Sequence, residues 1–182
     1  MTLLPPLDPI LAHIAAASLA IVLLVAAAQK LFDRETFALA LEQYRLLPER
    51  LVPGFALALP LAEAVAALLL LPVTSRAGGA AAALALLGLV TLAVTINLLR
   101  GRAHIDCGCG GSDGGQHLSW ALVARNAVLA LIALLAAAPT VPRELVWLDA
   151  ITVAAAAVGL FGLYAAVNQL LANAPRLARN GP

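Results

Sequence analysis

Five apolar runs, each close to 20 residues long, restrict what this chain can fold into. A helix rises about 1.5 Å per residue, so about 20 residues cross the roughly 30 Å hydrocarbon core of a bilayer. The 182-residue sequence is 63% hydrophobic and 12% charged, whereas about 25% of an ordinary soluble domain is charged. A soluble fold of this size could not cover so much apolar surface. The sequence therefore predicts one all-α, multi-pass membrane domain over residues 1–182, with spans at about 10–31, 51–71, 79–99, 118–138 and 146–170.

The segment 33–50 lies between the first two predicted spans and differs from them in composition. Charged residues alternate there with Phe37, Leu39, Leu41 and Tyr44. This pattern predicts a short amphipathic helix at the membrane interface that ends before Pro48. The N-terminus has no basic region ahead of the first apolar run, so we expect no cleavable signal peptide.

The glycine-rich segment 100–117 holds both cysteines of the chain, Cys107 and Cys109, and two of its three histidines. So many glycines disfavour a helix or strand interior, which makes burial as small hydrophobic residues a weak explanation for the cysteines. Cysteines at i and i+2 can reach the Cα separation that a disulfide needs, and the small ring predicts a strained, easily reduced bond. We expect Cys107 and Cys109 to form a thiol–disulfide redox pair.

Two alternatives to a redox pair stay open. The cysteines could bind a metal ion together with His104, His117 or Asp106, although their spacing matches none of the usual zinc patterns. They could also have no chemical role. The redox interpretation assigns no metal ligand and no cofactor, and the net charge of +1 argues against nucleic acid as a partner.

Lysines and arginines are distributed unevenly between the two sides of the predicted bundle. Loops rich in these residues stay in the cytoplasm. The sequence therefore predicts that the N-terminus lies outside and that both the C-terminus and the cysteine loop lie at the cytoplasmic face, which in a bacterium is the inner side of the inner membrane. The richer side has Lys30, Arg34, Arg45, Arg50, Arg100, Arg102, Arg176 and Arg179, and the other has Arg76 and Arg143.

Polar side chains at the ends of the spans are further candidates. Positive charge near a thiol favours the thiolate, the nucleophile in disulfide exchange. We expect Arg100, Arg102 and Arg125 to have this effect, the alternative for Arg100 and Arg102 being contact with lipid head groups. His104 or Asp106 could relay a proton. The residues predicted to gather with the cysteines at one membrane face are Lys30, Asn97, Arg100, Arg102, Arg125 and Asn126.

Glu63 lies inside the second predicted span. An ionisable group at such depth is costly, so Glu63 should face the bundle interior and have a partner there. We expect electrostatic coupling to Arg125, either directly or through Asn97, Asn126 or a water molecule.

Several short motifs resemble the MauE family of methylamine-utilisation membrane proteins. The resemblance covers about residues 10–138. Its central motifs are INLLRGR at 96–102, DCGCGG at 106–111, LSW at 118–120 and ARNA at 124–127. Lys30, YRLLP at 44–48 and PLAE at 60–63 are similar to the wider DoxX-like superfamily, which includes MauE.

The resemblance implies a four-helix DoxX-like core with a fifth, C-terminal span. It also implies a role in maturation of the small (beta) subunit of methylamine dehydrogenase, a periplasmic and disulfide-rich protein, together with a thioredoxin-like partner, MauD. Cys107 and Cys109 would then exchange disulfides with that partner. The alternative is a non-catalytic membrane scaffold or transporter.

Overall fold

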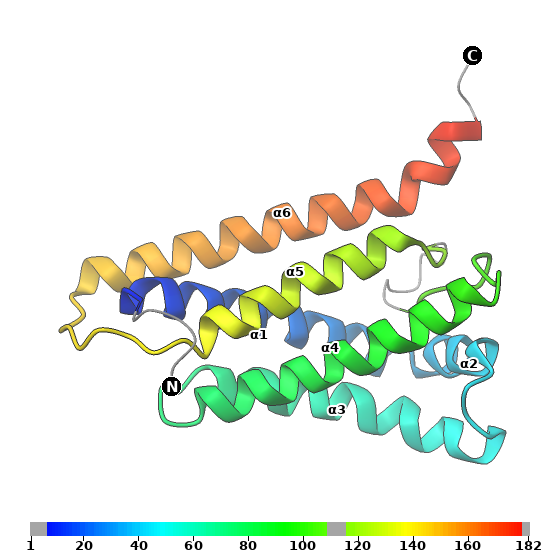
Figure 1. Cartoon of the computed structure of the whole chain (residues 1–182), viewed down its shortest axis with the longest axis horizontal. Coiled ribbons are helices and arrows are strands. Elements are labelled where there is room, and N and C mark those ends of the chain that lie inside the picture. The colour runs from blue at the N-terminus through cyan, green and yellow to red at the C-terminus, as the bar shows by residue number, and fades with distance from the viewer. Residues whose placement is uncertain (1–6, 109–115, 180–182) are drawn as a thin grey trace.

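Helices make up almost all of the computed structural model, which describes residues 7–108 and 116–179, and their side chains up to residue 173. The all-α prediction is confirmed, since the β pairing among the described residues consists of two isolated bridges. The elements are α1 (Pro9–Phe32), α2 (Arg34–Tyr44), a 3-10 turn η1 (Glu49–Leu51), α3 (Val52–Leu70), α4 (Arg76–Leu99), α5 (Trp120–Ala136) and α6 (Trp147–Arg179) (Figure 1).

Four of the helices form a closed bundle, and α6 lies against its side. α1 packs on α3 and α5, α4 packs on α3 and α5, and α6 packs on α1 (Figure 1). The core between them is rich in alanine, including Ala16, Ala66, Ala83 and Ala133, all at most 2% exposed. Small side chains let helix backbones approach closely, which is how helices associate where lipid removes the hydrophobic driving force.

Four helices are long and apolar enough to cross a membrane: α1, Glu49–Leu70, α4 and Trp147–Asn173. The predicted span 118–138 is different, because α5 has only 17 residues. Leu118 cannot start the helix, since its backbone pairs with Ile105 and Ser119 is extended. At the other end, the chain must leave the α conformation before Pro139.

A tight hairpin joins α3 to α4, which begins three residues earlier than the predicted span. Gly79 allows this contact, because a Cβ atom there would lie 2.6 Å from the backbone nitrogen of Leu70. Arg76 is buried and donates from Nε to the carbonyl of Leu70 at 3.2 Å. It thereby satisfies a carbonyl that the end of α3 leaves without a helical partner.

The amphipathic helix predicted within 33–50 is present as α2, which buries Phe37, Ala40 and Tyr44. It lies at the end of the bundle where α4 ends and α5 begins, and the start of α1 and the α3–α4 hairpin lie at the opposite end (Figure 1). Successive apolar helices of the described chain thus run in opposite directions, which is the arrangement on which the count of lysines and arginines was based. Which end faces the cytoplasm stays a prediction.

Candidate functional site

Backbone hydrogen bonds hold the two ends of the cysteine loop together. Asp106 and His117 form an antiparallel bridge. Cys107 donates its N–H to the carbonyl of Gln116 at 2.9 Å, and Leu118 donates to Ile105 at 3.2 Å. Ile105 and Leu118 are buried in a small apolar cluster. The chain therefore enters and leaves the loop at a fixed position on the bundle.

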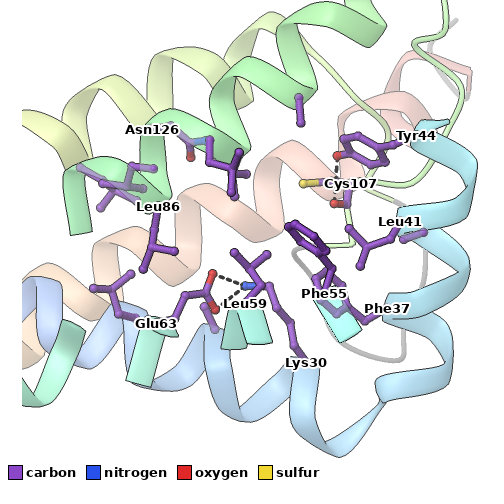
Figure 2. A pocket seen from close by; sticks show the side chains of 18 of the residues that line it. Lys30, Phe37, Leu41, Tyr44, Phe55, Leu59, Glu63, Leu86, Cys107 and Asn126 are labelled. Carbon is purple, nitrogen blue, oxygen red and sulfur yellow. Dashed lines mark hydrogen bonds and ion pairs between the residues drawn. The ribbon is translucent and has the colours of Figure 1, made fainter. Parts of the chain in front are cut away.

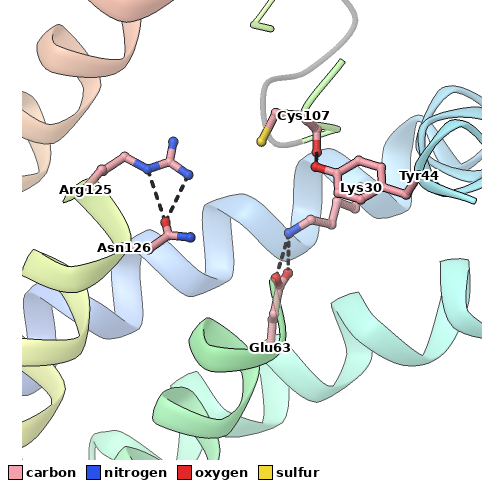
Figure 3. Close-up of polar contacts among 6 residues, drawn as sticks. All are labelled: Lys30, Tyr44, Glu63, Cys107, Arg125 and Asn126. Carbon is pink, nitrogen blue, oxygen red and sulfur yellow. Dashed lines mark hydrogen bonds and ion pairs between the residues drawn. The ribbon is translucent and has the colours of Figure 1, made fainter. Parts of the chain in front are cut away.

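Cys107 is buried between this bridge and α2. Its carbonyl accepts a hydrogen bond of 3.1 Å from the hydroxyl of Tyr44 (Figure 3). Its sulfur belongs to a disulfide. Cys109, the second predicted redox residue, lies outside the described residues, so the Cys107–Cys109 pair stays a prediction.

Gly108 explains how α2 can pack so closely on this part of the chain. Its φ of 68° is in the left-handed region, which side chains disfavour. A Cβ atom at this position would also lie 3.0 Å from Cβ of Ala40 and 3.3 Å from the ring of Phe37. Both backbone conformation and space therefore favour glycine next to Cys107.

Tyr44 is a neutral hydrogen-bond donor in this site. Burial raises the pKa of its hydroxyl well above the ordinary range, and the positive charge of Arg125 opposes this with a smaller lowering of the pKa. The hydroxyl thus keeps its proton and its bond to Cys107 at physiological pH.

A cavity of about 310 Å³ lies inside the bundle and reaches from Cys107 down to the middle of the helices (Figure 2). Most of its wall is apolar, with Phe37, Phe55, Leu59 and Leu86 among its side chains. Its polar or ionisable lining residues are Lys30, Tyr44, Glu63, Cys107, Arg125, Asn126 and Tyr164. The cavity thus connects the predicted redox residue with most of the polar groups of the bundle interior.

Glu63 faces the bundle interior and has a partner there, as expected, but that partner is Lys30, and the direct contact with Arg125, one of the two routes that the sequence left open, is not made. Glu63 accepts two hydrogen bonds from Nζ of Lys30, at 2.6 and 2.7 Å (Figure 3). Lys30 is 8% exposed and Glu63 is 5% exposed. The sequence allowed this pair, because one helix ends and the other begins at the same face, but depth estimates alone could not choose between two cations.

Arg125 is held by amides instead. It donates from Nη1 to Oδ1 of Asn168 on α6 at 2.9 Å, and from Nη2 to Oδ1 of Asn126 at 3.2 Å. Its guanidinium carbon lies 5.8 Å from the ring centroid of Tyr164, within range of a cation–π interaction. Asn126 in turn donates to Thr91 at 3.0 Å. This network fixes a full positive charge in the wall of the cavity.

The other predicted supporting residues lie in different surroundings. Arg102 donates to the carbonyls of Gln43 at 2.6 Å and Tyr44 at 3.3 Å, and to Oδ1 of buried Asn97 at 3.2 Å. It thus anchors the C-terminal end of α2, where a cation also suits the helix dipole. Arg100 and His104 are exposed. Among the described residues, the cations that line the cavity with Cys107 are Lys30 and Arg125, so Arg100 and Arg102 are placed less favourably than expected for stabilising a thiolate.

Asp106, His104 and the cysteine loop are the residues of the proton-relay and metal-site hypotheses. Oδ1 of Asp106 is buried and accepts no hydrogen bond from the residues that the structure describes. Within those same residues, no three His, Cys, Asp or Glu side chains are grouped so as to hold a metal ion.

Three residues of the site were not predicted from the sequence: Tyr44, Tyr164 and Asn168. Tyr44 carried a detectable signal, because Phe37, Ala40 and Tyr44 follow the three- and four-residue spacing of one helix face. Tyr164 and Asn168 carried none, since the position of α6 around the bundle depends on tertiary packing.

Known proteins resemble this chain over most of its length. The family model described as methylamine utilisation protein MauE matches residues 8–139. The MauE proteins of Paracoccus versutus and Methylorubrum extorquens are 44% and 42% identical to it, over 66% and 69% of this chain and 64% and 68% of their own lengths. The MauE protein of Paracoccus denitrificans is 41% identical over 64% of this chain and 62% of its own.

This chain spans about two thirds of the length of the relatives it matches. No solved structure matches it. Because the family model covers well over half of the residues, including all four helices of the closed bundle and the cysteine loop, the chain belongs to the MauE family.

Proposed function

We propose that this chain is a membrane thiol–disulfide exchange protein that supports maturation of the methylamine dehydrogenase beta subunit. Membership of the MauE family of methylamine-utilisation proteins supports methylamine dehydrogenase as the enzyme whose maturation this chain assists. The observation that carries the chemistry is the position of Cys107, buried against α2 at a cavity that Arg125 lines with a positive charge, whereas the charge of Lys30 is paired with Glu63. A sulfur in such electropositive surroundings is a good leaving group, because nearby cations stabilise the thiolate.

The proposed reaction is a dithiol–disulfide exchange with a thioredoxin-like maturation protein. A thiolate of the partner attacks one sulfur of the Cys107–Cys109 disulfide, and the other cysteine leaves as a thiolate. The partner's second thiol then attacks the mixed disulfide. The partner ends as a disulfide and this chain as a dithiol, so two electrons pass from the partner to this chain. Asp106, whose buried Oδ1 accepts no hydrogen bond from the described residues, would accept a proton released in the exchange.

The surroundings of Cys107 suit the sulfur that leaves in the exchange, because Cys107 is buried and its backbone is fixed. Tyr44 and the Asp106–His117 bridge fix its backbone from two sides. Exchange reactions depend on access and on the alignment of the attacking thiol. A partner that attacks Cys109 would therefore displace a sulfur held at a constant place on the bundle.

The test uses the full-length protein and single substitutions in the loop. Alkylation and mass measurement before and after mild reductant should show that Cys107 and Cys109 change together between disulfide and dithiol. Cys107→Ser and Cys109→Ser should each abolish formation of mature beta subunit in cells, and one of them should trap a mixed disulfide with the thioredoxin-like partner. Thiols that stay free under oxidising conditions would overturn the proposal.

Two histidine variants separate the redox proposal from a metal site. His104→Ala and His117→Ala remove candidate metal ligands without touching either sulfur. Under the proposed function both variants mature the beta subunit normally. A loss as severe as that of the cysteine variants, together with bound zinc in the purified protein, would mean that the loop is a metal site.

A further inference from the structure

The cavity below Cys107 has the size and position of a ligand site that opens to the lipid. Its volume of about 310 Å³ is at the small end of the roughly 300–1,000 Å³ range of ligand pockets. Phe55 on α3 and Leu89 on α4 line it and are also 38% and 50% exposed on the outer surface of the bundle. Both helices are candidate membrane spans. A ligand would therefore enter sideways from the bilayer and must be lipophilic.

The two cations of the cavity have hydrogen-bond donors left over. A lysine ammonium has three N–H bonds, of which Lys30 gives two to Glu63. An arginine has five, and Arg125 gives three to Asn126 and Asn168. Since Glu63 neutralises Lys30, the positive charge of Arg125 is left to the cavity. These groups call for a ligand with oxygen acceptors, such as carbonyls, that can gain negative charge.

Aromatic rings form much of the polar end of the cavity. Phe37 and Phe55 lie on one side of Cys107 and Tyr44 on another (Figure 2). Tyr164 is close to Arg125. Aromatic side chains pack preferentially against other flat rings in offset or edge-to-face arrangements. The shape and surface of this end thus suit a planar ring better than a flexible chain.

We propose that this cavity binds the ring of a membrane quinone and that the quinone reoxidises the cysteine pair. The inference rests on the proposed function, because a protein that accepts two electrons from its partner must pass them on before it can act again. In the step proposed, two thiols and one quinone give one disulfide and one hydroquinone. The S–S bond forms, and two electrons and two protons move from sulfur to the two carbonyl oxygens. Arg125 would stabilise the negative charge that develops on those oxygens, and the third N–H of Lys30 would donate a hydrogen bond to one of them.

Binding is tested with the full-length protein in detergent and with decylubiquinone, a benzoquinone with a ten-carbon tail. Leu59→Trp places a large ring inside the cavity and should weaken binding about tenfold or more, which corresponds to about 1.4 kcal/mol. Leu61→Trp is the matched control, because Leu61 is on the same helix, is 48% exposed and does not line the cavity. Both variants must keep the size-exclusion profile of the unmodified protein. Equal weakening by both, or by neither, would overturn the inference, as would binding of oleate but not of the quinone.

A second measurement keeps this inference distinct from the proposed function. Protein reduced with dithiothreitol and then freed of it is mixed anaerobically with decylubiquinone, and thiols and hydroquinone are counted. One hydroquinone per disulfide is expected, and Arg125→Gln should slow its formation about tenfold or more. Cys107→Ser should still bind the quinone but form no hydroquinone.

If the unmodified protein exchanges disulfides with its thioredoxin-like partner yet does not bind the quinone, the quinone site is wrong and the proposed function stands. If it binds the quinone but its cysteines never exchange, the proposed function is wrong.

Discussion

Lys30 of α1 and Glu63 of α3 are joined by two hydrogen bonds, from Nζ to Oε1 at 2.6 Å and to Oε2 at 2.7 Å, and both side chains are buried. Replacing either residue alone, as in Lys30→Met or Glu63→Gln, leaves an uncompensated charge or a stranded polar group. Such a loss lowers the free energy of unfolding by about 3–5 kcal/mol in protein interiors, whereas replacing both partners lowers it much less. Thermal unfolding in detergent and the amount of folded protein in membranes should show this non-additivity.

The matched control for this cycle pairs Glu63→Gln with Arg125→Gln. Arg125 bonds Asn126 and Asn168 rather than Glu63, so the two losses should add. Additive losses for Lys30 and Glu63, with coupling between Glu63 and Arg125, would contradict the observed pairing.

Gly108→Ala should destabilise the contact between the cysteine loop and α2. The left-handed conformation costs a non-glycine residue about 1–2 kcal/mol, and the new methyl group would crowd Ala40 and Phe37. We expect a lower unfolding temperature and faster reduction of the disulfide at Cys107 by a small thiol. Gly88→Ala is the control, because a Cβ atom there meets nothing within 4 Å and alanine favours the helix interior of α4. A Gly108→Ala protein as stable as the control would show that α2 is not held closely against the loop.

Tyr44→Phe should change how stability depends on alkaline pH. Burial holds the pKa of Tyr44 above its ordinary value near 10 in the folded state, so an unfolded chain loses this proton first. The contribution of Tyr44 is therefore complete below about pH 10 and decreases as the pH rises above that value. The phenylalanine variant should be less stable by about 1 kcal/mol at neutral pH, through loss of the bond to Cys107, and should show a shallower decline above about pH 10. Parallel unfolding curves across that range would contradict this account.

The lysine and arginine count predicts that the end with α2 and the cysteine loop faces the cytoplasm. A reporter fused after Arg179 should then be active only in the cytoplasm. A membrane-impermeant thiol reagent added from outside should not label Cys107, even after treatment with a permeant reductant. Labelling from outside would place the loop in the periplasm, where a periplasmic partner could reach it directly. A cytoplasmic loop instead requires that its exchange partner meet it on the inner side.

Periodicity and length were enough to predict helices in every apolar run, because a backbone surrounded by lipid must satisfy its own hydrogen bonds. They were not enough to fix the ends of α5. There the pairing of Leu118 with Ile105 prevents an earlier start, and that contact joins residues on either side of the loop. Ser119 occupies the N-cap position of α5, but its side chain makes no capping hydrogen bond.

The sequence predicts which residues belong to the candidate site better than it predicts which of them are in contact. Lys30, Glu63, Arg125 and Asn126 could all be assigned to the bundle from their cost in lipid and from the alternating direction of the spans. The choice of Lys30 rather than Arg125 as the partner of Glu63 depends on how the helices are rotated about their axes. That rotation is set by the packing of alanine and leucine side chains throughout the core, and no short sequence motif determines it.

The bridge between Asp106 and His117 makes the segment between them modular. Because Asp106 and His117 are paired, the loop-closure cost of lengthening the segment between them is small, about 0.6 kcal/mol for each doubling. Insertions or exchanges within 108–115 that keep Gly108 and the cysteines should therefore leave the bundle and its cavity intact. A loop of this kind can be adapted to a different partner protein without redesigning the membrane domain that supports it.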